Sequence, residues 1–133
     1  MSISINPRFI TFEGIDGCGK STQSLLLKEY LDSKNIPSII VREPGGTTIS
    51  EKIRKILLSK ENSEITSRTE ALLMTAARAQ LTNEVIIPTL NSGKWVISDR
   101  FSDSTIAYQG GGRNLDVEWL QSLNSFATYK VNP

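Results

Sequence analysis

Eight consecutive residues, Gly14-Ile15-Asp16-Gly17-Cys18-Gly19-Lys20-Ser21, have the types and the spacing needed to bind a chain of phosphates. Glycines allow a backbone to turn tightly and to point successive N–H groups inward, toward anionic oxygens at a helix N-terminus. The Lys20 ammonium group suits β- and γ-phosphates, and the Ser21 hydroxyl is a hard oxygen of the kind that Mg²⁺ binds. An apolar run precedes this segment and a helical pattern follows it, so the sequence predicts a nucleotide-binding phosphate loop.

A second pair of chemically capable residues, Asp99-Arg100, directly follows an apolar segment. Open α/β sheets bind ligands at the carboxyl ends of their strands. An acid at that place can hold Mg²⁺ directly or through water, and an adjacent arginine can grip a phosphate with two parallel hydrogen bonds. The alternative is an ordinary surface pair at the end of a strand.

Two further groups have a less specific pattern. The segment Arg42-Glu43-Pro44-Gly45-Gly46-Thr47 follows another apolar run and, taken alone, is only a turn. Arg78 lies one helical turn after Met74, on a face rich in leucine and alanine. A buried arginine there needs a partner, which a ligand could supply, but spacing alone fits a surface salt bridge equally well.

Alternating strand and helix patterns surround these residues and predict an α/β domain with an open parallel sheet and a right-handed crossover. The predicted strands are Arg8–Glu13, Ser38–Glu43 and Trp95–Asp99. Predicted helices cover Lys20 to about Lys34, Thr47–Ser59, a long segment from a capping box at Ser67-Arg68-Thr69-Glu70 to Asn91, and a last segment that Asp116 caps. We expect Pro88 to kink the last turn of the long helix.

Composition bounds the function. The 133 residues fit one domain, residues 1–133, and 15 Lys+Arg against 14 Asp+Glu leave a net charge of +1. No global field therefore attracts nucleic acid or an anionic membrane. One cysteine permits no internal disulfide, the absence of histidine excludes histidine-based catalysis and metal sites, and no apolar run approaches the length of a membrane span. We expect a soluble cytoplasmic protein whose chemistry uses Asp, Glu, Arg, Lys and Mg²⁺.

Taken together, four segments make the chain resemble the bacterial thymidylate kinase family, within the class of P-loop nucleoside-monophosphate kinases. The segments are Phe12 to Thr22, Arg42 to Thr47, Ala77-Arg78-Ala79-Gln80, and Asp99 to Gly110. The resemblance implies the P-loop NTPase fold, a three-layer α/β/α arrangement around a parallel sheet. It also implies transfer of the γ-phosphoryl group of MgATP to dTMP, giving dTDP, by an enzyme that forms a homodimer.

The resemblance also implies a role for each site residue. The phosphate loop would hold the donor ATP through Gly14, Ile15, Asp16, Gly17, Cys18, Gly19, Lys20, Ser21 and Thr22. Ser21 and Asp99 would hold the metal. Asp16 would face the 3′-hydroxyl of the acceptor, and Arg54 and Arg100 would grip its phosphate. Arg78 would bond the thymine edge, Thr105 and Gln109 would lie near the base, and Tyr108 would disfavour a 2′-hydroxyl. Glu43 and Asp99 would organise the arginines and the metal.

The chain departs from the family pattern at Met74, where a phenylalanine commonly stacks on thymine. The arginines of the lid, and the adenine pocket, lie further along in the family than Pro133, and related sheets usually carry five strands. We therefore expect the domain to be incomplete at its C-terminus and these 133 residues to be inactive by themselves.

Two other functions are compatible with the phosphate loop alone. Another small-acceptor or deoxynucleoside kinase would share the loop, but would not predict Arg78, Thr105 and Gln109 together. A nucleotide-dependent regulatory protein would require an Asp-x-x-Gly segment after a strand, whereas Asp99 is followed by Arg100-Phe101-Ser102.

Overall fold

A three-stranded parallel sheet organises the protein. The computed structural model describes residues 6–102, 110–112 and 114–133. The strands β1 (Phe9–Phe12), β2 (Ser38–Arg42) and β3 (Trp95–Asp99) lie in the order β1–β3–β2. In this register Val96 of β3 lies between Phe9 and Ile39. The three predicted strands and their parallel direction are confirmed, although β1 begins one residue later than expected and β1 and β2 each end one residue earlier.

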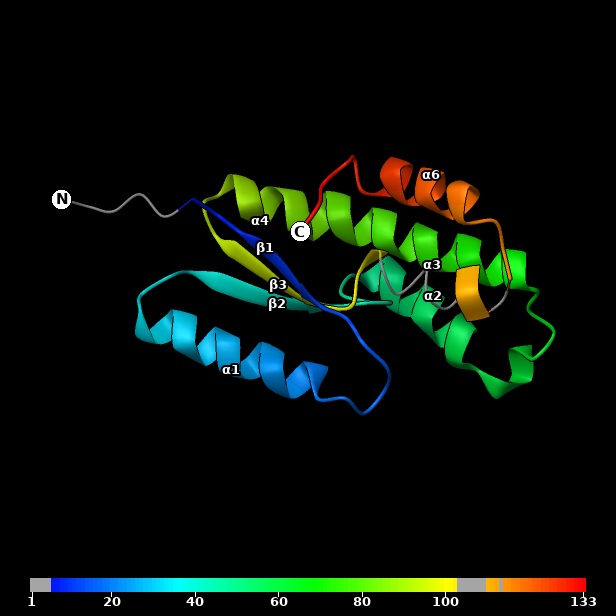
Figure 1. Cartoon of the computed structure of the whole chain (residues 1–133), viewed down its shortest axis with the longest axis horizontal. Coiled ribbons are helices and arrows are strands. Elements are labelled where there is room, and N and C mark those ends of the chain that lie inside the picture. The colour runs from blue at the N-terminus through cyan, green and yellow to red at the C-terminus, as the bar shows by residue number, and fades with distance from the viewer. Residues whose placement is uncertain (1–5, 103–109, 113) are drawn as a thin grey trace.

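Helices cover both faces of the sheet, which confirms the three-layer α/β/α class. Helix α1 (Lys20–Ser33) lies on one face, and the end of α3 (Ser67–Leu81) with α4 (Ile87–Asn91) covers the other (Figure 1). The remaining helices, α2 (Thr48–Leu58) and α6 (Val117–Ala127), pack along α3. Short helical segments at Lys60–Asn62 (η1) and Thr82–Ile86 (η2) complete the described elements.

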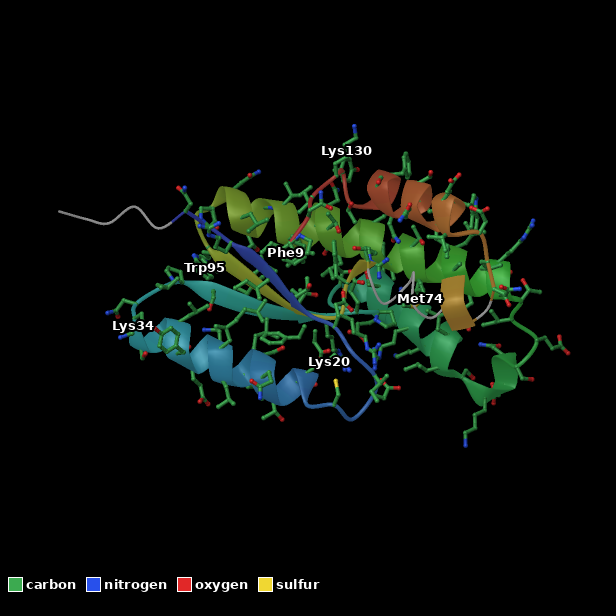
Figure 2. The ribbon with its side chains drawn as sticks, viewed as in Figure 1. Phe9, Lys20, Lys34, Met74, Trp95 and Lys130 are labelled. Carbon is green, nitrogen blue, oxygen red and sulfur yellow. The ribbon has the colours of Figure 1, made fainter. Side chains whose placement is uncertain are left out.

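The hydrophobic core lies between the sheet and the α3–α4 layer. It joins strand residues to helix residues and to the segment after β3: Phe9, Val41, Val96, Leu81, Ile86 and Phe101. The rings of Phe9 and Phe101 meet edge to face with centroids 4.8 Å apart, and Figure 2 shows Phe9 directed toward the helices. This packing anchors the chain just beyond Asp99, where the predicted site lies.

The face of α1 is less buried than its sequence pattern indicates. Leu31 is 2% exposed, whereas Leu25, Leu26 and Tyr30 are 58%, 52% and 58% exposed. Helical periodicity shows which residues share a side of a helix, but it does not show whether another element covers that side.

The start of α3 corrects the predicted capping box. Thr66 is the N-cap, with extended backbone, and its side chain accepts a hydrogen bond from the Thr69 N–H at 3.3 Å. Ser67 is already helical, so the capping box was wrong by one residue. Adjacent hydroxyl residues both have the chemistry of an N-cap, and the backbone conformation of the preceding loop decides between them.

The long helix changes its hydrogen bonding before Pro88. The segment Thr82–Ile86 is a π-helix, and the Ile87 N–H donates to the Thr82 carbonyl. Because Pro88 has no N–H and its ring crowds the preceding turn, a wider turn accommodates it there. The irregularity thus lies one turn earlier than the predicted kink. The predicted cap of α6 is confirmed, since the Asp116 carboxylate accepts from the Trp119 N–H at 2.8 Å.

Candidate active site

The phosphate loop connects β1 to α1 at the carboxyl edge of the sheet. Gly19, with φ of 94°, is the N-cap of α1 and carries no side chain over the first-turn N–H groups. Any other residue would be strained at this φ, so glycine leaves the positive end of the helix open to an anion. Lys20 is 9% exposed, and its Nζ donates to the Ile15 carbonyl at 2.8 Å. The lysine therefore folds back over the loop that precedes it.

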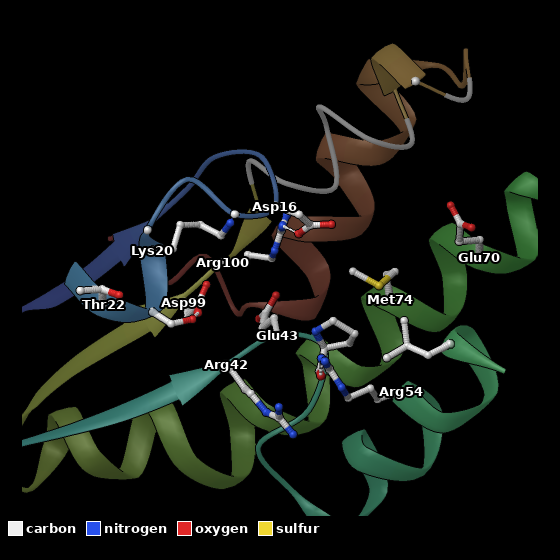
Figure 3. Close-up of a pocket in the computed structure, with 16 residues that line it drawn as sticks. Asp16, Lys20, Thr22, Arg42, Glu43, Arg54, Glu70, Met74, Asp99 and Arg100 are labelled. Carbon is white, nitrogen blue, oxygen red and sulfur yellow. Dashed lines mark hydrogen bonds and ion pairs between the residues drawn. The ribbon is translucent and has the colours of Figure 1, made fainter. Parts of the chain in front are cut away.

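Two oxygen-bearing side chains meet beside the loop. The Ser21 hydroxyl donates to Asp99 Oδ2 at 2.6 Å, although the two residues are 78 positions apart. Asp99 is the last residue of the central strand, so the sheet brings it to the start of α1 (Figure 3). A hydroxyl and a carboxylate of this kind are hard oxygen ligands that suit Mg²⁺.

Arg100 has a strained backbone and forms an ion pair across the site. Its φ is 76°, which is uncommon for a residue with a side chain. Its N–H donates to the Phe12 carbonyl at 3.0 Å, and its own carbonyl accepts from the Ser98 hydroxyl at 2.6 Å. The Arg100 guanidinium pairs with the exposed carboxylate of Asp16. Strain that neighbours hold in place is typical of functional sites.

Helix α2 holds the turn after β2 from one side. Arg54 Nη1 donates to the Pro44 carbonyl at 2.8 Å, and the Glu51 carboxylate accepts from the Gly46 N–H at 3.0 Å. The Gly46 hydrogen bond and the nearby Arg42 guanidinium lower the pKa of Glu51 from its ordinary value. A side chain at Gly46 would bring its Cβ within 2.7 Å of Leu81 Cδ1. The predicted turn after β2 is thus fixed close to the core.

Arg78 forms a buried ion pair beneath the site. Its Nε and Nη2 donate to Glu43 Oε2 at 2.8 and 2.6 Å, and Nη2 also donates to the Phe101 carbonyl at 3.0 Å. A third element contributes Asn124 Oδ1, which accepts from Nη1 at 2.5 Å. Burial raises the pKa of Glu43 above its ordinary value, and the Arg78 charge partly offsets this effect. The surface salt bridge considered for Arg78 is therefore wrong: the pair is buried.

A cavity of about 1010 Å³ lies between the phosphate loop, the strand ends and helices α2 and α3 (Figure 3). The predicted site residues that line it are Asp16, Gly17, Gly19, Lys20, Ser21, Thr22, Glu43, Arg54, Met74, Asp99 and Arg100. The predicted residues outside this lining are Gly14, Ile15, Cys18 and Arg78. Thr105, Tyr108 and Gln109 lie outside the described residues.

Five further residues line the cavity without having been predicted as site residues: Arg42, Pro44, Leu58, Glu70 and Gly112. Two of them follow from helical spacing, since Leu58 lies four residues after Arg54 and Glu70 lies four residues before Met74. Arg42 and Pro44 belong to the strand-end turn, whose position at the same sheet edge was the available signal.

Comparison with known proteins identifies the family. The family model described as Thymidylate kinase matches residues 12–133 of this chain. The chain belongs to the thymidylate kinase family. Among curated thymidylate kinases, that of Thermosipho africanus is 58% identical over 125 residues, and that of Fervidobacterium nodosum is 56% identical over 125 residues. The crystal structure of thymidylate kinase from Ehrlichia chaffeensis superposes with a TM-score of 0.88 at 44% identity.

The thymidylate kinase relatives are longer than this chain. The aligned regions cover 94% of the chain but 62% of each of those two curated relatives, and the Ehrlichia structure is matched over 96% of this chain and 71% of its own. Among the described residues, no helix has the length and apolar character needed to cross a membrane. Within the same part of the chain, no group of three or more Cys, Asp or Glu side chains is arranged to hold a metal.

Proposed function

We propose that the protein containing this chain transfers the γ-phosphoryl group of ATP to dTMP and gives dTDP. The observation that carries the proposal is one cavity whose two ends suit two phosphorylated ligands. Lys20 of the phosphate loop lies at one end, and Arg54 and Met74 lie at the other (Figure 3). Membership of the thymidylate kinase family supports these two ligands as donor and acceptor.

The donor half rests on the phosphate loop. Loop N–H groups and the open N-terminus of α1 attract anionic oxygens, and the Lys20 ammonium adds a full charge for the β- and γ-phosphates. Transfer of a phosphoryl group needs in-line placement and cations around the developing charge more than covalent chemistry. Lys20 and Arg100 are two of the four cationic residues that line the described cavity, together with Arg42 and Arg54.

The acceptor half rests on the strand-end and α2–α3 residues. Arg54 and Arg100 supply forked donors for a phosphate, and Asp16 supplies an acceptor for a sugar hydroxyl. Met74 offers a polarizable side chain on which a base can lie. We assign Arg78 to the thymine edge by family resemblance, and Thr105, Tyr108 and Gln109 to the base and sugar in the same way.

The residues present fit Mg²⁺, the metal that the family implies. Ser21 and Asp99 provide two hard oxygens in contact, and Mg²⁺ in kinases is commonly held by few protein ligands together with phosphates and water. When bound, Mg²⁺ would neutralise charge on the β- and γ-phosphates. Asp99 would hold it, and the Ser21 hydroxyl would be available as the second protein oxygen.

Calorimetric titration with dTMP, dCMP, ATP and GTP tests the proposal, followed by an assay of dTDP formation by a chain of the relatives' length that includes this sequence. Selective binding of dTMP and ATP is expected. A preference for GTP without dTMP binding would instead support a regulatory nucleotide switch, and a preference for another acceptor would support a different kinase. From the family resemblance we further propose a homodimer, which sedimentation velocity tests, and a cytoplasmic location, which cell fractionation tests.

A further inference from the structure

Asn124 is a polar residue buried in the middle of α6. It is 6% exposed, between Leu120 and Ala127, which are also buried. Asparagine is a poor helix former, and burial removes its hydration. Such a residue needs a compensating partner, and Asn124 Oδ1 accepts a hydrogen bond from Arg78 Nη1 at 2.5 Å.

The contact with Arg78 satisfies the oxygen of the Asn124 side-chain amide but not its nitrogen. Its Nδ2 is buried and has no hydrogen-bond partner among the described residues. A buried donor without a partner is costly, so an apolar residue would serve α6 better if packing were the requirement. The structural value of Asn124 is therefore concentrated in the oxygen that it presents to Arg78.

Arg78 in turn fixes a carboxylate in the cavity wall. Three elements hold its planar guanidinium: Glu43 after β2, the Phe101 carbonyl after β3, and Asn124 of α6. The Phe101 ring also lies 5.3 Å from the Arg78 Cζ. Glu43 lines the cavity, and its Oε1 is buried without a hydrogen-bond partner among the described residues. The orientation of Arg78 thus sets where this carboxylate stands.

We propose that Asn124 is a positioning residue for the acceptor half of the site. From outside the cavity it fixes Arg78, and through Arg78 it fixes the Glu43 carboxylate beside Arg54 and Arg100. This inference rests on the proposed function, because it assigns the acceptor nucleotide to that half of the cavity. The described hydrogen bonds of Lys20 and Ser21 go to Ile15 and Asp99, whereas Asn124 acts on Arg78, so we expect ATP binding to be independent of this relay from Asn124 through Arg78 to Glu43.

Three variants test the relay by calorimetry with dTMP and with ATP. Asn124→Leu has a similar volume but no acceptor, and we expect dTMP to bind about tenfold more weakly while ATP affinity stays within about twofold. Asn124→Asp keeps an oxygen at the same place and should restore dTMP binding to within about threefold of the parent. Leu120→Ala removes buried apolar volume from the same helix and leaves the Asn124 side chain intact, and should lose stability but not dTMP affinity.

Each contrary result has a distinct meaning. Unchanged dTMP affinity in Asn124→Leu, or an equal loss in Leu120→Ala, would overturn the positioning role while the proposed function stands. A parent chain that binds ATP but no dTMP would overturn both proposals. If Asn124→Leu does not fold, Asn124→Ser gives the same comparison, because its hydroxyl is too short to reach Nη1. Nitrogen-15 spectra of the Arg78 guanidinium should show slower rotation about Nε–Cζ in the parent than in that variant.

Discussion

Lys20 combines a buried stem with an ammonium group whose described contacts lie within its own loop. We predict that Lys20→Ala, made in a chain of the relatives' length that includes this sequence, lowers kcat by about 10²–10³-fold, because a charge that acts on the transferring phosphoryl group is lost. Stability should fall by only about 1 kcal/mol, since one hydrogen bond to Ile15 disappears. Turnover of ATP and dTMP at the parental rate would show that the phosphate-loop assignment is wrong.

Met74, on α3, lines the end of the cavity that we propose for the acceptor. We predict that Met74→Phe strengthens dTMP binding by about 0.5–1.5 kcal/mol, because a flat ring stacks better on a base than a thioether does. The affinity for ATP should not change. Calorimetry with both nucleotides measures the difference. Weaker dTMP binding in Met74→Phe would indicate that the cavity with methionine accommodates a base other than thymine.

Arg78 is 1% exposed and is paired with a buried glutamate, so its replacement has consequences beyond ligand binding. We predict that Arg78→Ala costs about 3–5 kcal/mol of unfolding free energy, because Glu43 would be left buried without its counter-ion. Arg54→Ala is the matched control, since Arg54 makes one described hydrogen bond to a carbonyl and should cost about 1 kcal/mol. Urea unfolding of both variants measures the contrast, and equal losses would refute it.

At the scale of elements, the turn after β2 depends on Glu51 of α2. Because its pKa is lowered in the folded protein, ionised Glu51 stabilises the fold at pH values above its ordinary pKa of 4.5, and this contribution is lost as the pH falls through the folded pKa. We predict that Glu51→Gln lowers stability at neutral pH by up to about 1 kcal/mol, and that the difference disappears in acid. Thermal unfolding from pH 7 to pH 3 measures it.

The exposed Lys52 on the same helix supplies the control for this pH dependence. Lys52→Gln also removes one charge but leaves the hydrogen bond from Gly46 to Glu51 in place, so the difference in stability between this variant and the parent should show no step near the pKa of a carboxyl group. A difference between Glu51→Gln and the parent that persists unchanged at pH 3 would mean that Glu51 acts through packing.

Local sequence patterns predicted the strands, the phosphate loop and the place of Asp99 and Arg100, because strand ends of a parallel sheet necessarily meet at one edge. The N-cap of α3 was misplaced because Thr66 and Ser67 have the same chemistry. The contact between Arg78 and Asn124 could not be predicted, since Asn124 lies 46 residues away on a helix whose docking depends on tertiary packing. Pairings of this kind have no periodic signal in the sequence.

At the scale of the whole molecule, α1 presents three large apolar side chains to solvent, Leu25, Leu26 and Tyr30. Clustered apolar surface favours association. We predict that this chain self-associates in solution, and that the double variant Leu26→Glu with Tyr30→Glu is less associated at equal concentration. Sedimentation velocity over a dilution series measures this, with Gln23→Glu as a control that adds charge without removing apolar surface. A monomeric parent would contradict the prediction.

The central place of β3 also determines when the fold can form during synthesis. Strands β1 and β2 are complete by Arg42, yet both pair with β3, which begins at Trp95. A ribosome that adds about 5–20 residues per second therefore leaves two strands without their partner for several seconds. Helices α1 to α3 can form in that interval from local contacts, whereas the sheet must wait. Slow translation between residues 43 and 94 would prolong the exposure of both strands and should increase the demand for chaperones.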